Sequence, residues 1–328
     1  MKWLLLLIVL LILAFVVITA VAAYPRQHPF KAGGRTLEQY RAIEIENGTV
    51  FDQNFPFETV HFDISEGGRI AARVFGDDTA PNSILLVHGI GAAGERWNNP
   101  AGLLAESINA QVFVMDLRGH NQSSGTPYQL DRFGQYEDDI AEVISQIREK
   151  RPEGKFWLAG HSMGGGIALR FALKENRPQI SGYILFAPIF GPGPTAVDET
   201  PSDATLRIDR VRLTALIILN MVGISHFNDR PVAYLNAPPD FASYSFTAIA
   251  SGLPTSPTSA ADALKVMEGR TLIISGADDP YVRNDGFEEM TTDMSNFHVE
   301  VLPGLGHDGI LNAPQTQALI AQWANATD

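Results

Sequence analysis

The sequence predicts an α/β protein with a mostly parallel sheet and helices on both of its faces. Short, almost uninterrupted apolar runs bounded by turn residues recur along the chain, and helical patterns separate most of them. Strands that are buried on both faces have this pattern, and helical crossovers between them make neighbouring strands parallel. The apolar runs are residues 83–88, 111–116, 155–160, 182–187, 270–275 and 297–302.

The composition of the chain excludes several functional classes. Its 328 residues, of which 45% are hydrophobic, suffice for one large domain or two average ones with buried cores. The formal net charge of −13, without a basic cluster, argues against nucleic acid as a partner. The absence of cysteine excludes disulfide bonds, a thiolate nucleophile and cysteine metal sites. No HExxH or EF-hand motif is present, and we expect neither a metal ion nor a cofactor.

The N-terminal segment is apolar enough to cross a membrane. Between Trp3 and Ala23 only Thr19 is polar, and as a helix this stretch reaches roughly 30 Å, the thickness of a bilayer core. Residues 21–23 also resemble the small-residue cleavage site of a signal peptide. We expect residues 1–23 to be a retained single-pass anchor, with the rest of the chain on the extracytoplasmic side. The alternative is a cleaved signal and a secreted or periplasmic protein.

The chain then divides into a linker and one domain. Residues 24–54 carry prolines, glycines and charges without a sustained period, which indicates a linker with one short helix. The domain spans residues 55–328 and opens with an antiparallel hairpin, whose alternating stretches 57–65 and 69–75 flank a Glu-Gly-Gly turn. Within the domain, the apolar residues of 138–150 fall on one face of a helix.

A long interruption of the strand–helix alternation predicts a cap. About eighty residues separate Ala187 from Arg270, far more than an ordinary crossover needs. The insertion, at about residues 191–262, follows the carboxyl end of a strand, where open α/β sheets bind ligands. It contains the nearly continuous apolar run 213–224. We expect this insertion to lie over a site.

A glycine-rich loop after the first apolar run has two incompatible interpretations. Gly89, Gly91 and Gly94 match the dinucleotide-binding pattern, and Asp116 follows where an acid for a ribose hydroxyl is expected. Alternatively, His88 and Gly89 open a loop that supplies an oxyanion-hole amide in a serine hydrolase. Both functions need glycine, because a residue without Cβ lets the backbone turn tightly and approach a ligand. The decision has to come from elsewhere in the chain.

The stretch GHSMG, residues 160–164, decides between them. It matches G-x-S-x-G and lies between an apolar run and the glycine-rich start of a helix. In such an elbow a strained turn exposes the serine, here Ser162, as a nucleophile. The helix N-terminus behind it favours developing negative charge. A helix cap made of small residues is the structural alternative, and the succession of strand, motif and helix argues against it.

A serine nucleophile needs a general base, and the base needs an acid that orients it. In the elbow architecture both follow on loops after later strands. His307, in the glycine-flanked loop PGLGHDGI, fits the base, whereas His298 lies inside an apolar run and His161 would point away from the serine. Asp278 and Asp279 both follow the strand at 270–275, and we choose Asp279 because the loop must turn back toward His307.

From about residue 58 to its C-terminus the chain resembles the α/β-hydrolase family, in particular the branch of monoacylglycerol lipases, lysophospholipases and serine aminopeptidase-like proteins. The stretches that carry the resemblance are HGIGAAGERW, VFVMDLRGHNQSSG, GHSMGG, SGADDPYV and GLGHDG. The chain order Ser162, Asp279, His307 is that of this family. In this branch the acid is the fourth residue of a G-x-x-D turn, which agrees with Asp279. A dinucleotide-binding fold would leave this ordered set unexplained.

The resemblance also implies roles for the residues of two loops. The family's oxyanion amides correspond to those of Ile90 and Met163, so the glycine-rich loop is interpreted as an oxyanion loop. Asp116 and Arg118 are then members of a turn and not ribose ligands. The chain departs from the family at Asn121, where glycine is usual, and we expect a local adjustment of the loop there.

These observations predict a serine hydrolase that cleaves carboxylic esters through an acyl-enzyme, with a monoacylglycerol or lysophospholipid as substrate. We expect Leu216, Ile217 and Met221 of the apolar cap run to line a slot for the acyl chain above the serine. Alternatively, this run packs wholly onto the domain. Two other functions stay open: a serine aminopeptidase-like amidase, and a membrane-tethered binding protein with a non-catalytic hydrolase fold.

Overall fold

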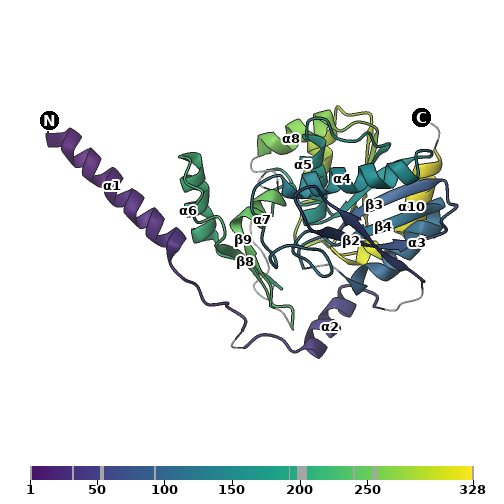
Figure 1. Ribbon diagram of the computed structural model, residues 1–328, viewed down its shortest axis with the longest axis horizontal. Helices are drawn as coiled ribbons and strands as arrows, with labels where there is room; N and C mark the ends of the chain where they lie inside the picture. Colours follow the sequence, from purple (N-terminus) through teal and green to yellow (C-terminus); the bar gives the residue numbers. More distant parts are fainter. Residues whose placement is uncertain are drawn as a thin grey trace.

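The computed structural model describes residues 2–31, 33–51, 55–91, 94–191, 193–197, 205–238, 241–253 and 257–326. Figure 1 shows a central sheet flanked by helices, a smaller cap beside it, and a long N-terminal helix that projects beyond the cap.

In the described part of the chain, an eight-stranded sheet forms the centre of the domain, in the order β1-β2-β4-β3-β5-β6-β10-β11. The pairs from β4 to β11 are parallel, and the hairpin β1–β2 joins the sheet antiparallel, as the sequence predicted. The strands are Glu58–Asp63 (β1), Arg69–Phe75 (β2), Asn82–Val87 (β3), Ala110–Met115 (β4), Phe156–His161 (β5), Gly182–Phe186 (β6), Arg270–Gly276 (β10) and Phe297–Leu302 (β11).

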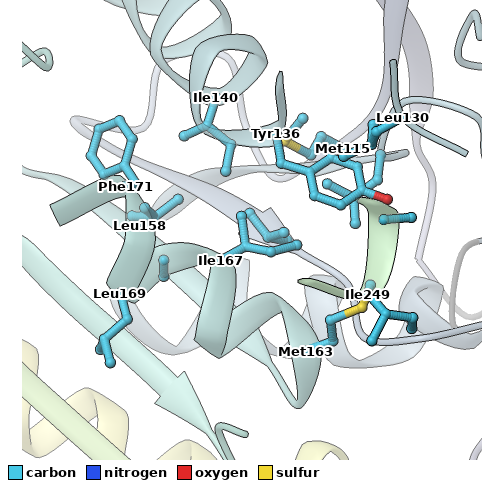
Figure 2. Close-up of a cluster of buried hydrophobic side chains, with 14 of the residues drawn as sticks. Met115, Leu130, Tyr136, Ile140, Leu158, Met163, Ile167, Leu169, Phe171 and Ile249 are labelled. Atoms are coloured by element: carbon cyan, nitrogen blue, oxygen red, sulfur yellow. The ribbon is translucent and has the colours of Figure 1, made fainter. Parts of the chain in front are cut away.

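Both faces of this sheet are covered, which explains the unbroken apolar runs of its strands. Successive residues of β3 enter different cores: Leu85 and Val87 join one, and Ile84 and Leu86 join the other. Helices α4 and α5 pack in the first core (Figure 2), and helices α3 and α10 pack in the second. These helices span Asn98–Ile108 (α3), Gln135–Lys150 (α4), Met163–Ala172 (α5) and Pro314–Asn325 (α10).

The cap contains a small sheet that was not predicted. In its described part, three short strands pair antiparallel in the order β7-β8-β9. A strand of three residues is too short to show an alternating pattern, and β8 begins with a proline, which strands tolerate at their first residue. The cap elements are Leu206–Ile208 (β7), Arg210–Met221 (α6), Pro231–Leu235 (β8), Ser243–Ser245 (β9) and Phe246–Ser251 (α7).

The N-terminal segment is bound to this cap. Helix α1 packs against α6, and Ala22 in the last turn of α1 has no exposed surface. The buried guanidinium of Arg212 donates to the backbone carbonyl of Tyr24, and Arg26 pairs with Asp209 at 3.0 Å. After α1 the chain therefore runs along the cap before it reaches the domain. The remaining elements are Lys2–Ala23 (α1), Leu37–Glu46 (α2), Glu95–Trp97 (η1), Pro257–Val266 (α8), Asp285–Thr291 (α9) and Gly309–Leu311 (η2).

Candidate active site

Ser162 occupies a strained turn between β5 and α5. Its φ of 56° and ψ of −120° lie outside the regions that L-residues ordinarily adopt. The turn is held by its own backbone groups: the N–H of Ser162 donates to the carbonyl of Phe186 at 3.0 Å. Its carbonyl accepts from the amides of Gly165 and Ile189, also at 3.0 Å. The serine thus lies at the N-terminus of α5, where developing negative charge is favoured.

The glycines of GHSMG are required by close backbone contacts. A Cβ on Gly160 would lie 2.4 Å from the carbonyl oxygen of Gly164, and one on Gly164 would lie 2.2 Å from that of Val87. The glycine-rich loop after β3 reaches the same place, since a Cβ on Gly89 would lie 2.9 Å from the Cβ of Ser162. The structure therefore brings the two motifs of the sequence together.

His307 and Asp279 meet at the ends of neighbouring strands. Nδ1 of His307, in the loop after β11, lies 2.7 Å from Oδ2 of Asp279, in the loop after β10. The other carboxylate oxygen of Asp279 accepts from the amide of Tyr281 at 2.8 Å, and this carboxylate has no exposed surface. An imidazole that donates through Nδ1 leaves Nε2 free to act as a base. The ring of His307 lies 4.8 Å from that of His161, the residue before Ser162.

The other candidates considered for the base and the acid lie elsewhere. Asp278 is exposed, and its neighbour Asp279 is the residue that faces the imidazole. His298 is exposed on β11 and lies 3.5 Å from Glu300. The ring of His161 is buried, and its Nε2 contacts the backbone carbonyl of His307 at 3.1 Å. His161 therefore supports the loop that carries His307.

Asp116 and Arg118 are engaged in local structure. Oδ2 of Asp116 accepts from the side chain of Asn121 at 2.9 Å, which closes the turn after β4. Asn121 has a φ of 43°, a conformation that asparagine and glycine tolerate better than other residues. Arg118 makes two hydrogen bonds to Asp139 of α4, at 2.6 and 3.0 Å. These hydrogen bonds engage both side chains within the protein, which agrees with their interpretation as structural residues and not ribose ligands.

The proposed oxyanion residues lie between the domain and the cap. Ile90 is partly buried against the first core. The side chain of Met163 points toward Ile249 of α7 (Figure 2), and a Cβ on Gly252 would lie 2.5 Å from Cγ of Met163. The first turn of α5 is thus covered by the cap.

The three cap residues predicted to hold an acyl chain lie on α6 with different exposure. Leu216 is buried and belongs to the same core as Ala22 of α1. Ile217 is 46% exposed and Met221 is 80% exposed. Their role toward a substrate stays a prediction.

A buried charge cluster adjoins the histidine and was missed by the sequence analysis. Arg96 of η1 lies 2.6 Å from Glu44 of α2 and 3.0 Å from Asp308, the residue after His307. The three side chains are 14%, 4% and 16% exposed. Nothing in the local sequence signals a contact between residues so far apart. The cluster connects α2 to the loop that carries His307.

This cluster affects the protonation of His307. Burial lowers the pKa of His307, but the hydrogen bond and charge of Asp279, together with the charge of Asp308, outweigh that effect. The pKa of His307 therefore lies above its ordinary value of 6.5, while the positive charge of Arg96 acts in the opposite direction. Burial lowers the pKa of His161 to about 4, so this neighbouring ring is neutral near pH 7.

Among the described residues, no group of three or more His, Cys, Asp or Glu side chains is arranged to hold a metal ion. Ser162, His307 and Asp279 are the residue types that nucleophilic catalysis by a serine uses.

Comparison with known proteins places this chain among hydrolases. A family model described as "Serine aminopeptidase, S33" matches residues 79–314. The monoglyceride lipase of Rattus norvegicus is 28% identical over 171 residues, which are 52% of this chain and 54% of that protein. The chain thus spans about half the length of this curated relative.

Solved structures show the same fold. A soluble variant of monoglyceride lipase from Saccharomyces cerevisiae, in complex with a substrate analog, has a TM-score of 0.61 and 18% identity, over 83% of this chain and 97% of that chain. An esterase from Exiguobacterium antarcticum has a TM-score of 0.55 and 21% identity, over 81% and 99%. These similarities confirm the predicted α/β-hydrolase fold.

The charges around His307 predict two opposite shifts in the pH profile. A general base must be neutral, so kcat/KM falls as the pH drops through the pKa of His307. Asp308→Asn removes a negative charge and should move this acid limb to lower pH, whereas Arg96→Gln removes a positive charge and should move it higher. The wild-type limb should lie above pH 6.5. The measurement is kcat/KM for a soluble ester from acid to neutral pH.

Glu300→Gln serves as the control, because this partly exposed carboxylate on β11 pairs with His298 at 3.5 Å. Its acid limb should coincide with that of the wild type. Shifts of Asp308→Asn and Arg96→Gln in the same direction would contradict the proposed electrostatics.

Proposed function

Because the chain belongs to the serine aminopeptidase S33 family, we propose that it is a serine hydrolase that cleaves carboxylic esters of monoacyl lipids. The observation that carries this proposal is the 2.7 Å contact between His307 and Asp279. The ring of His307 also adjoins that of His161, which directly precedes a serine held in a strand-to-helix turn. These are the side chains that two-step acyl transfer needs.

In the proposed mechanism, Ser162 Oγ attacks the ester carbonyl and Nε2 of His307 accepts its proton. Asp279 holds the Nδ1–H tautomer and stabilises the imidazolium that forms. The amides of Ile90 and Met163, with the N-terminus of α5, stabilise the negative charge on the carbonyl oxygen. His307 then protonates the leaving alcohol, and water attacks the acyl-enzyme by the same route to release the acid.

Two observations support a lipid ester over other substrates. The curated relative described above is a monoglyceride lipase, and the yeast enzyme of the same name shares the fold. The cap helix α6 also presents large apolar side chains to its surroundings, including Ile217, Ile218 and Met221. An amide substrate is the second candidate, because the family description names an aminopeptidase.

The N-terminal helix supports a location at a membrane. Helix α1 is 22 residues long, and by length and composition it can cross a bilayer. Its end packs against α6, which exposes further apolar residues at Val211 and Val222. A retained anchor would therefore hold α6 at the bilayer surface, with the domain on the extracytoplasmic side. Substrate lipids would then be present at high local concentration.

The assignment of the catalytic residues predicts a graded loss of hydrolysis. Ser162→Ala and His307→Ala should each lower kcat by about 10⁴-fold or more, because members of a triad act as one unit. Asp279→Asn should also be severely impaired, since it no longer fixes the Nδ1–H tautomer. The matched control is Asp278→Asn, the exposed neighbour, with near wild-type kcat. Reversed results for the two aspartates, measured with a soluble ester, would show that the acid has been misassigned.

The lipid assignment predicts that activity rises with acyl chain length. Each buried methylene contributes about 0.8 kcal/mol, close to fourfold in affinity. Across glycerol monoesters from acetyl to dodecanoyl, kcat/KM should rise at least tenfold, and aminoacyl amides should be poor substrates. Ile217→Asn should flatten the series, whereas Val266→Asn, an equally exposed apolar position on α8, should leave it unchanged. A flat or falling series in the wild type would leave a general esterase or a peptidase.

Removal of α1 should release the protein from membranes without loss of catalysis. A chain that begins at Tyr24 retains the carbonyl that Arg212 binds and the Arg26–Asp209 pair, so its cap stays seated. We expect it to be soluble and to hydrolyse a short-chain ester at the wild-type rate. A chain that begins at Leu37 lacks both contacts and should be less active and less stable.

Membrane fractionation and activity assays of the two truncated chains test this. Equal activity of both would show that the N-terminal contacts do not support the cap. N-terminal sequencing of the full-length protein provides a separate check, because a mature chain that starts at Ala23 or Tyr24 would replace the anchor with a cleaved signal peptide.

A further inference from the structure

The hydroxyl of Tyr244 joins the cap to the loop that follows β3. Tyr244 lies on β9 of the cap sheet and has no exposed surface. Its Oη accepts the backbone N–H of Gly91 at 2.8 Å. Gly91 directly follows Ile90, whose amide belongs to the proposed oxyanion hole. The amide next to the catalytic donor is therefore held by a side chain from the cap.

The neighbouring histidine fixes the direction of this hydrogen bond. Oη of Tyr244 also lies 2.8 Å from Nε2 of His120, whose Nδ1 lies 3.0 Å from the carbonyl of Arg118. A carbonyl only accepts, so Nδ1 of His120 carries the proton and Nε2 is an acceptor. The tyrosine hydroxyl consequently donates to His120, and its lone pairs are directed to Gly91. Burial lowers the pKa of His120 to about 3, which keeps this ring neutral at working pH.

The same part of the loop has a second contact with the cap. Gly91 has a φ of 66°, and a Cβ there would lie 2.8 Å from a methyl group of Leu235 on β8. The ring of Tyr244 is itself held between aromatic neighbours, with ring centroids 5.1 Å from Tyr128 and 5.4 Å from His120. The hydroxyl of Tyr244 is thus presented to the loop from a rigid position.

We propose that Tyr244 is a positioning residue, which holds the oxyanion loop in its active conformation through the amide of Gly91. This inference rests on the proposed function, because it concerns the donor at Ile90. An oxyanion donor stabilises the transition state because it is fixed in place before the charge develops. A mobile loop should therefore weaken transition-state stabilisation more than it weakens substrate binding. Catalysis then depends on a seated cap, although no cap residue takes part in the chemistry.

The test is Tyr244→Phe, which removes one oxygen atom and keeps the ring. Tyr234→Phe is the matched control, because Tyr234 is a buried tyrosine of the same cap sheet whose hydroxyl donates to the carbonyl of Pro231 at 3.3 Å. Active sites of the full-length enzyme are counted with a fluorophosphonate, so that kcat refers to competent molecules. Hydrogen–deuterium exchange of peptides that contain Gly91 reports on the loop independently of activity.

We expect Tyr244→Phe to lower kcat per titrated site by about 10- to 100-fold, less than the loss of an oxyanion donor itself. KM should change by less than about twofold. Affinity for a trifluoromethyl ketone, which mimics the tetrahedral intermediate, should fall in parallel with kcat/KM. Exchange at Gly91 should rise. Tyr234→Phe should leave all four quantities near wild type.

Unchanged exchange, or raised exchange with an unchanged kcat, would overturn the proposal. A structural role alone would reduce the number of titrated sites and leave kcat per site intact. If wild-type protein hydrolyses no ester, the proposed function fails, and the exchange data still decide whether Tyr244 holds the loop.

The direction of these hydrogen bonds can be measured on the wild-type protein. The imidazole ¹⁵N spectrum should show His120 as the Nδ1–H tautomer with a hydrogen-bonded Nε2. An Nε2–H tautomer would overturn the proposed direction of the hydrogen bonds and, with it, the role of Tyr244.

Discussion

A serine with a φ of 56° carries backbone strain of order 1–3 kcal/mol, and the structure around Ser162 has to hold it in place. Backbone hydrogen bonds do so: its N–H donates to β6, and its carbonyl accepts from Gly165 and Gly166 of α5 and from the start of the loop after β6. The same turn demands glycine at Gly160, Gly164 and Gly89, because main-chain atoms or the serine itself lie where their Cβ would be. Sheet, helix and glycine-rich loop are therefore fitted to one strained residue.

The remaining groups of the site are positioned from three directions. Asp279 and His307 arrive on adjacent parallel strands, so the sheet itself sets their separation. Arg96 links the histidine loop to α2, and because its two carboxylate partners are buried, loss of the guanidinium would leave uncompensated charge. Tyr244 reaches the glycine-rich loop from the cap. Segments from the N-terminal region, the sheet and the cap thus contact the loops that carry the site residues.

The sequence predicted the parts of this arrangement that depend on local pattern. Strands buried on both faces appear as apolar runs, the hairpin alternates, and the order of Ser162, Asp279 and His307 is legible because each follows a predicted strand. The cap sheet was not predicted, because its strands are too short for a period. Tyr244 and Gly91 are separated by 153 positions, and no residue near either one indicates the other. Contacts of this kind depend on how the cap docks, which local pattern does not encode.

The proposed mechanism requires Ser162 to be an activated nucleophile, and covalent labelling can show whether it is. The full-length protein would be treated with a fluorophosphonate, digested, and the adduct located by tandem mass spectrometry. One adduct is expected, on the peptide that contains Ser162, and it should disappear when the protein is denatured before labelling. A folded protein that acquires no adduct, or acquires it on a different residue, would show that Ser162 is not the activated nucleophile.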